Sequence, residues 1–187
     1  MNSAKYIDRL SSISFPDVFN PYRDVCGEHD HSRSAAIRRV NLQRYLDAVL
    51  AGGVDSLWLG RDCGYRGGRR TGIALTDEIQ LPTLERHFEF DGISKATVGG
   101  LVKERTATEV WKIIREVNAK VFLWNVFPFH PFEAGNSMSN RRHTTREFDQ
   151  CKDLLLGLID WLQPKRIIAL GADAHREVGR LGLKASL

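Results

Sequence analysis

The chain has 187 residues, of which 42% are hydrophobic and 27% are charged, as expected for one soluble globular domain with a substantial core. Its net charge of +4 is compatible with a polyanionic partner but does not identify one. The three cysteines, Cys26, Cys63 and Cys151, lie far apart, which excludes a disulfide framework and a four-cysteine iron–sulfur site.

The chain begins with a turn-rich lead-in over residues 1–33, for which we expect irregular structure with one short helix. It has no apolar leader, and no later stretch approaches the ~20 apolar residues of a membrane span. The sequence also contains no internal repeat and no CxxC or HExxH spacing. We therefore expect a single metal-free domain over residues 1–187, located in the cytoplasm.

A long amphipathic helix is predicted from Ser34 onward. Gly52 and Gly53 end it, and the apolar run "DSLWLG" (residues 55–60) then predicts a buried strand that leads into a glycine-rich loop. The helix has apolar residues at i, i+3, i+4 and i+7, which share one face: Leu42, Tyr45, Leu46 and Val49.

Two further helices are predicted by capping boxes, in which a threonine is followed three residues later by a glutamate. Thr106 with Glu109 predicts one helix, and Thr144 with Glu147 predicts a longer one that ends at residues 163–164. The expected apolar faces are Val110, Ile113, Ile114 and Val117 in the first helix, and Phe148, Cys151, Leu155, Leu158, Ile159 and Leu162 in the second.

The remaining segments alternate between short apolar strands and a short helix. "KVFLWNV" (120–126), "RIIALG" (166–171) and "LKASL" (183–187) predict strands, and "ADAHREVGRLG" (172–182) predicts a helix. Such alternation is typical of parallel β-α units. We therefore expect a three-layer α/β/α sandwich with a central, mostly parallel four-stranded sheet, whose ligands bind outside the carboxyl ends of the strands.

The segment "GRDCGYRGGRR" (residues 60–70) follows one of these strands. Its glycines let a ligand approach the backbone closely, and its four arginines can contact phosphates. The spacing matches neither GxGxxG nor GxxxxGK[ST], so the common nucleotide-binding loops are not indicated. A flexible loop with solvated arginines remains the alternative.

The segment "NVFPFHPFEAGNSMSNRRH" (residues 125–143) follows the next strand. The side chain of Asn125 offers a donor and an acceptor that can pair with the edge of a base, although a bond to a nearby backbone group is the alternative. Arg141, Arg142 and His143 form a basic cluster that either contacts DNA or is a solvated loop.

Together these segments resemble the motifs of the uracil-DNA glycosylase superfamily. "GRDCGYRGGRRTGIALTDE" is similar to the GQDPYH type of loop and to the arginine and "TGxxFT" stretch that follow it. "LWNVFPFHP…GNSMSNR" is similar to the "WN…P(W/F)HP…GN" region, and "RIIALGADAHREVGRLG" is similar to the strand and helix after it. The likeness extends over residues 56–183 and includes the order of the elements.

The resemblance implies a monofunctional, cofactor-free glycosylase that takes part in base excision repair. Such enzymes flip uracil out of DNA and hydrolyse its N-glycosidic bond, which leaves an abasic site. The transition state has an oxocarbenium-like sugar and an anionic base. Asp62 corresponds to the water-activating aspartate, and Asn125 corresponds to the asparagine that reads the uracil edge. The expected partner is uracil-containing DNA, bound by a monomer, at the nucleoid in a bacterium.

Two further groups of residues follow from the resemblance. The first binds the substrate, and the second holds DNA phosphates, which supply affinity without sequence information. The substrate-binding group is Gly60, Arg61, Cys63, Gly64, Tyr65, Leu75 and Trp124, and the DNA-binding group is Arg66, Arg69, Arg70, Arg141, Arg142 and His143.

Two departures from the motif flank the catalytic acid. Arg61 replaces the usual glutamine or glutamate, and its charge keeps Asp62 ionised but disfavours a nearby sugar cation unless the side chain points away. Cys63 replaces the usual proline, and it is either a small buried filler or a reactive thiol.

Two other departures concern the base. Gly64 replaces the tyrosine that excludes a 5-methyl group, so we expect 5-substituted uracils to be rejected less strictly. Leu75 replaces the phenylalanine that stacks on uracil, so another ring, such as Trp124 or Phe127, is expected to supply the stacking.

The superfamily's "HPS"-like motif, whose histidine donates to the uracil oxygen, does not occur before the sequence ends at "KASL". The dipeptide His130-Pro131 lies in a different element. Two rival functions therefore stay open: a non-catalytic DNA-binding protein that recognises abasic or damaged sites, and an unrelated α/β enzyme acting on a small molecule.

Overall fold

The structure, a computed structural model, describes residues 2–117 and 119–186. Its centre is a sheet of three parallel strands in the order β3-β2-β5, formed by β2 (Ser56–Asp62), β3 (Val121–Phe127) and β5 (Arg166–Ala169). Gly60 pairs with Asn125 in the register of β2 and β3. Because both strands end at the same edge, the sequence segments that follow them come together there.

The expected four-stranded sheet is wrong in its strand count. The segment 183–187 was predicted as the fourth strand, but within the described residues it joins the sheet only at Ser186, through one parallel bridge to Ile168. Two backbone hydrogen bonds, from Ala169 N to Ser186 O and from Ser186 N to Ile167 O, are too few to define a strand.

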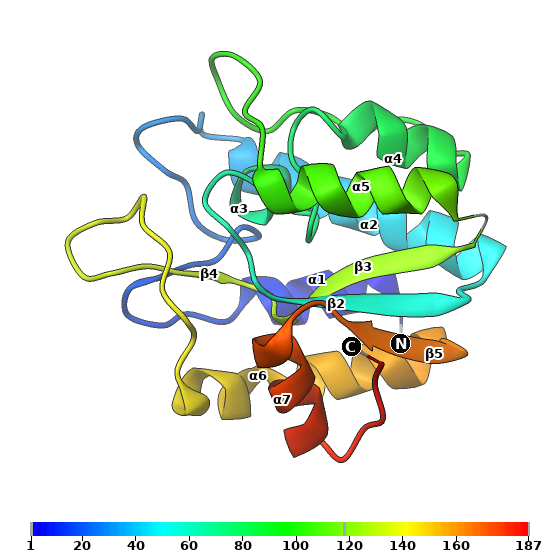
Figure 1. Cartoon of the computed structure of the whole chain (residues 1–187). Coiled ribbons are helices and arrows are strands. Elements are labelled where there is room, and N and C mark those ends of the chain that lie inside the picture. Colours follow the sequence, from blue (N-terminus) through cyan, green and yellow to red (C-terminus); the bar gives the residue numbers. More distant parts are fainter. Residues whose placement is uncertain (1, 118, 187) are drawn as a thin grey trace.

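Helices cover both faces of the sheet (Figure 1). One face is covered by α2 (Ser34–Gly52), α4 (Leu81–Phe88) and α5 (Arg105–Glu116), and the other by α6 (Thr145–Leu162) and α7 (Ala172–Arg180). The four-residue helix α3 (Gly68–Thr71) interrupts the glycine-rich segment. In the described part of the chain, no helix combines the length and apolar character needed to cross a membrane.

The lead-in is part of the core. It contains the expected short helix, α1 (Ser3–Ser11), and also β1 (Val18–Phe19), which pairs antiparallel with β4 (His130–Pro131). Tyr6 of α1 is fully buried at the β3 edge of the sheet, with its ring 6.0 Å from that of Trp124 and 6.1 Å from that of Trp161.

The two longest helices follow the sequence pattern closely. In α2 the four predicted residues are buried, and in α6 the capping box of Thr144 and Glu147 is confirmed. The capping box predicted at Thr106 is wrong: α5 already begins at Arg105, and the backbone N–H of Glu104 donates to Asp77 Oδ2 at 2.7 Å. The α5 face is rotated accordingly, with Trp111 buried and Ile113 47% exposed.

Candidate active site

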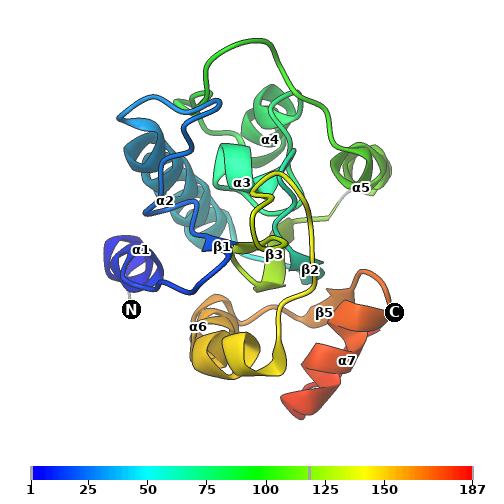
Figure 2. The ribbon, with the colours of Figure 1, turned by 90° about the vertical axis from the view of Figure 1, so that its left-hand side faces the viewer.

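A hollow of about 270 Å³ lies at the carboxyl end of β2. This end of the strand faces the viewer in Figure 2. The wall of the hollow includes the whole run of residues 60–64. The other lining residues come from the turn before α4, the start of α5, the loop before α6 and the end of β5: Leu75, Glu104, Thr106, Asn140, Arg141 and Leu170.

Asp62 lines this hollow, and both of its carboxylate oxygens already have hydrogen-bond partners. Oδ1 accepts from Nδ1 of His143, and Oδ2 accepts from Nε of Arg61. The His143 ring stacks between Phe127 (5.1 Å between ring centroids) and Phe148 (5.7 Å). His143, predicted to contact DNA, is thus a buried partner of Asp62.

Arg61 turns toward α7, where its Nη1 donates to Asp173 Oδ2 at 3.0 Å. Asp173 also pairs with Arg142 at 3.1 Å and with Arg176 at 2.6 Å. Hydrogen bonding to Arg61 and to Arg176, against some burial, holds the pKa of Asp173 below its usual range. The charge of Arg61 is therefore shared between two carboxylates, which reduces its cost beside a sugar cation.

Asn125 lies just behind the wall of the hollow. Its side chain is fully buried, Nδ2 donates to Cys63 Sγ at 3.3 Å, and Oδ1 has no hydrogen-bond partner within the described residues. A Cβ atom at Gly60 would lie 2.5 Å from that oxygen, so a side chain at this position would force Asn125 to shift. A buried acceptor without a donor is costly, and it can be satisfied by a ligand that reaches this point.

Leu75 and Cys63 separate the hollow from the core. Leu75 is a non-glycine residue with φ of 54°, a conformation that costs of order 1–3 kcal/mol and clusters at functional sites. The Cys63 thiol donates to Pro128 O at 3.3 Å, and burial raises its pKa to about 12. The geometry therefore favours the small buried filler over the reactive thiol.

Glu104 was not predicted as a site residue, yet it lines the same hollow as Asp62. A Cβ atom at Gly64 would lie 2.1 Å from Glu104 Oε1, and one at Gly67 would lie 2.1 Å from Oε2. The space that Gly64 frees is therefore filled by Glu104, and the expected room for 5-substituted bases is absent in this conformation. Burial and the negative charge of Asp77 raise the pKa of Glu104 to about 7.

The predicted rings do not face the hollow. Trp124 is 1% exposed, with its ring 6.0 Å from that of Phe122 on the same strand. Phe127 is fully buried against Phe129 and His143. The prediction that either ring stacks on the base is not supported, because both are already enclosed by core side chains.

Arg69 and Arg70, predicted to contact phosphates, are also buried. Arg69 donates to the backbone oxygen of Ser137 and lies 3.0 Å from His130 Nδ1. Arg70 donates to Thr97 Oγ1 at 3.0 Å and pairs with Glu78 at 3.3 Å. Both the phosphate contact and the flexible solvated loop are wrong for these two residues, since their guanidinium groups fix the loop to the rest of the fold.

The other predicted DNA contacts lie nearer the surface. Arg66 is exposed and lies over the Tyr65 ring at 5.8 Å, and Arg142 is 64% exposed. Arg141 instead makes a bidentate pair with Glu147, at 2.7 and 3.0 Å. Of the three arginines, Arg66 and Arg142 are thus the more exposed, and Arg142 also pairs with Asp173 at 3.1 Å.

His130 has a structural place in the loop before α6. Its Nδ1 accepts from Arg69 and its Nε2 donates to the backbone oxygen of Ser139 at 2.7 Å. Burial, together with the charge of Arg69, lowers its pKa to about 4. Residue 130 is therefore neutral at physiological pH and holds this loop together.

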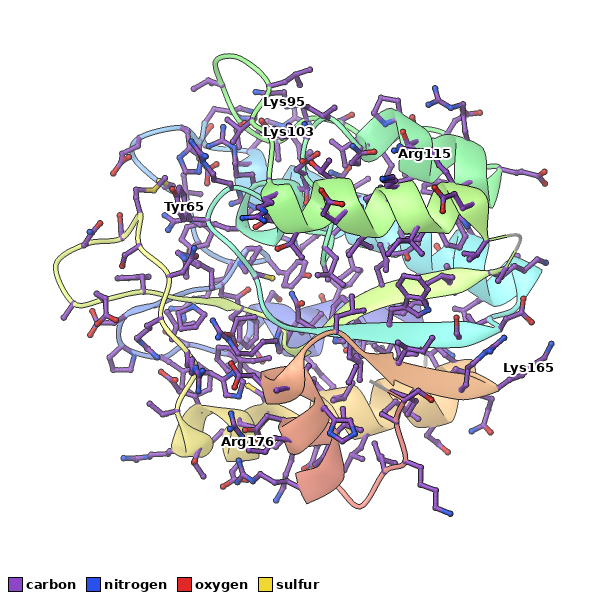
Figure 3. The ribbon with its side chains drawn as sticks, in the orientation of Figure 1. Tyr65, Lys95, Lys103, Arg115, Lys165 and Arg176 are labelled. Carbon is purple, nitrogen blue, oxygen red and sulfur yellow. The ribbon has the colours of Figure 1, made fainter. Side chains whose placement is uncertain are left out.

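Figure 3 shows where four labelled side chains lie relative to the ends of the strands. Tyr65 and Arg176 lie toward the carboxyl ends of the strands, whereas Arg115 and Lys165 lie toward the opposite end. Among residues 2–117 and 119–186, no group of three or more His, Cys, Asp and Glu side chains is arranged to hold a metal ion.

Comparisons with known proteins identify the family and similar folds. The family model of the uracil DNA glycosylase superfamily matches residues 54–186. No curated protein matches the chain. Among solved structures, that of wild-type Pedobacter heparinus SMUG2 is similar, with a TM-score of 0.59 and 15% sequence identity, over 96% of this chain and 80% of that one. At this identity, the structural likeness bears on the fold alone.

Proposed function

Because the chain belongs to the uracil DNA glycosylase superfamily, we propose that it removes uracil from DNA by hydrolysing the N-glycosidic bond. The observation that carries the proposal is the pairing of Gly60 with Asn125 in neighbouring strands. This pairing brings the buried Oδ1 of Asn125, which has no hydrogen-bond partner in the part of the chain that the structure describes, behind the hollow that Asp62 lines. Asn125 is the candidate for recognising the base, and Asp62 is the candidate for activating the water.

The proposed reaction uses Asp62 as a general base. A water molecule in the hollow gives a proton to Asp62 while its oxygen attacks C1′ of the flipped nucleotide. His143 and Arg61 orient the carboxylate through the hydrogen bonds that they donate to it. The negative charge of Asp62 also stabilises the positive charge that develops on the sugar.

Base recognition is assigned to Asn125. Its carboxamide can accept from an N–H group and donate to a carbonyl oxygen, which matches the edge of uracil. Asn125 is 1% exposed in this conformation, so contact with the base requires local movement of the wall at Leu75 and Cys63.

DNA is expected to lie across the carboxyl ends of the strands. Arg66, Arg142 and Arg176 are exposed there, and cations of this kind supply phosphate contacts whose strength falls with added salt. Affinity for DNA should therefore decrease steeply as the salt concentration rises.

A second function, that of a non-catalytic protein that binds abasic or damaged DNA, is favoured by one observation. Both carboxylate oxygens of Asp62 are occupied by protein donors, which leaves fewer lone pairs for a water molecule.

A gel assay on a duplex with a single uracil, followed by alkali, separates the two functions. Strand scission after alkali supports excision, because abasic sites are alkali-labile. A shifted band without scission contradicts excision and supports the binding protein. If neither strand scission nor a shifted band is seen, both functions are contradicted.

A further inference from the structure

The proposed function leaves one chemical requirement unassigned. When the C1′–N bond breaks, the electron pair stays on the base, and a donor to that base lowers the barrier. Among the described residues that line the hollow, five side chains can titrate: Arg61, Asp62, Cys63, Glu104 and Arg141.

Three of these groups keep their protons too firmly to serve. Burial raises the pKa of Cys63 to about 12, and its thiol already donates to a backbone oxygen. Hydrogen bonds to Asp62 and Asp173 outweigh the effect of burial and raise the pKa of Arg61, and the bond to Glu147 raises that of Arg141. Asp62 is engaged by His143 and Arg61 and is assigned to the water.

Glu104 differs from all of them. Within residues 2–117 and 119–186, no group donates a hydrogen bond to its carboxyl oxygens, although its backbone N–H is fixed by Asp77. The side chain extends over Gly64 and Gly67, where the absence of side chains leaves room for it. The carboxyl group of Glu104 therefore lies against Gly64 and Gly67 at the hollow, with no hydrogen-bond donor among the described residues.

We propose that Glu104 is the catalytic acid of this site and, in its protonated form, donates to the leaving base. This inference rests on the proposed function. As the C1′–N bond breaks, the O–H proton of Glu104 passes to the base, which leaves neutral, and Glu104 becomes a carboxylate. The attacking water gives one proton to Asp62 and its oxygen to C1′. Exchange with solvent then returns a proton to Glu104 and removes one from Asp62.

The surroundings of Glu104 support the presence of this proton near neutral pH. Asp77, from the segment before α4, accepts from the backbone N–H of Glu104. The other charged or titratable side chains that line the same hollow are Arg61, Asp62, Cys63 and Arg141. Burial and the negative charge of Asp77 raise the pKa of Glu104 to about 7. The donor is thus present below about pH 7 and is lost as the pH rises through that value.

The test compares wild type, Glu104→Gln and Glu104→Ala, with Glu109→Gln as the control on the exposed side of α5. Single-turnover excision of uracil and of 5-fluorouracil is followed across pH. The rate of uracil excision by the wild type is expected to fall above about pH 7, and this fall should be absent in Glu104→Gln. Glu104→Ala should lose ~10²-fold on uracil, the range of general acid catalysis, but only severalfold on 5-fluorouracil, a better leaving group.

An equal loss on both bases with an unchanged pH profile would show that Glu104 acts only in packing, and would overturn the inference while the proposed function stands. A wild type that releases no base overturns both. A carboxyl ¹³C NMR titration, assigned with Glu104→Gln, gives a readout independent of activity. A resonance titrating near pH 7 is expected, and a value near the ordinary 4.3 of glutamate would contradict the proposal.

Discussion

The two carboxyl groups that line the hollow have opposite surroundings. Asp62 accepts hydrogen bonds from His143 and Arg61, whereas Glu104 has no donor among the described residues and lies near Asp77. The contrast supports the proposed division of roles between the two groups, because hydrogen bonds orient Asp62 whereas burial and Asp77 raise the pKa of Glu104. Each variant described below changes the surroundings of one of these two carboxyl groups.

The largest effect is expected from Asp62→Asn, which removes the proposed base and keeps the shape of the side chain. Excision of uracil should slow by ~10²-fold or more, measured by alkali-induced scission under single-turnover conditions. Asp149→Asn, on the exposed side of α6, is the matched control and should behave like wild type. Activity retained in Asp62→Asn would remove Asp62 from the mechanism.

At the second carboxyl group, Glu104→Gln should change how the free energy of unfolding depends on pH. Folding raises the pKa of Glu104. The contribution of this side chain to the free energy of unfolding is therefore fully present below the pKa of the unfolded chain and is lost as the pH rises through about 7. Urea unfolding should show that Glu104→Gln gains about 2 kcal/mol over wild type between about pH 5 and pH 8. A constant difference across this range would contradict the raised pKa.

A smaller effect is expected from His143→Phe. Phenylalanine retains the stacking between Phe127 and Phe148 but cannot donate to Asp62, so the carboxylate loses one of its two orienting bonds. Excision should slow by about tenfold, the equivalent of ~1.4 kcal/mol. His175→Phe, at an exposed position of α7, serves as the control, and equal rates for the two variants would show that His143 does not orient Asp62.

The smallest effect is expected from Gly64→Ala. The added methyl group would lie 2.1 Å from Glu104 Oε1, and the flexible side chain can avoid it by turning toward solvent. The pKa of Glu104 should then fall toward its ordinary value, so that excision near neutral pH slows by about threefold. Gly27→Ala, whose methyl group meets nothing within 4 Å, should leave the pH profile unchanged, and an unchanged profile in Gly64→Ala would contradict the account.

Much of this architecture follows from local sequence patterns. The periodicity of α2, the capping box at Thr144 and the apolar runs of β2 and β3 are properties of neighbouring residues. Because parallel strands end at one edge, the proximity of Asp62 and Asn125 to one hollow could also be predicted.

The features that the sequence did not reveal depend on contacts between distant segments. Arg70 is of a residue type that often binds phosphate, but its partners Glu78 and Thr97 lie on segments before and after α4. Glu104 stands in a charged run typical of a solvated surface, and only the folded chain brings it over Gly64. Its one sequence signal is the clustering of glycines opposite it, which indicates that something must approach closely but not what.

The proposed reaction breaks an N-glycosidic bond in DNA. Free base released from a single-uracil duplex under single-turnover conditions can be quantified by mass spectrometry. We expect one equivalent of free uracil for each abasic site formed by the wild-type protein. Recovery of intact uracil-containing strands from a stable protein–DNA complex would contradict it.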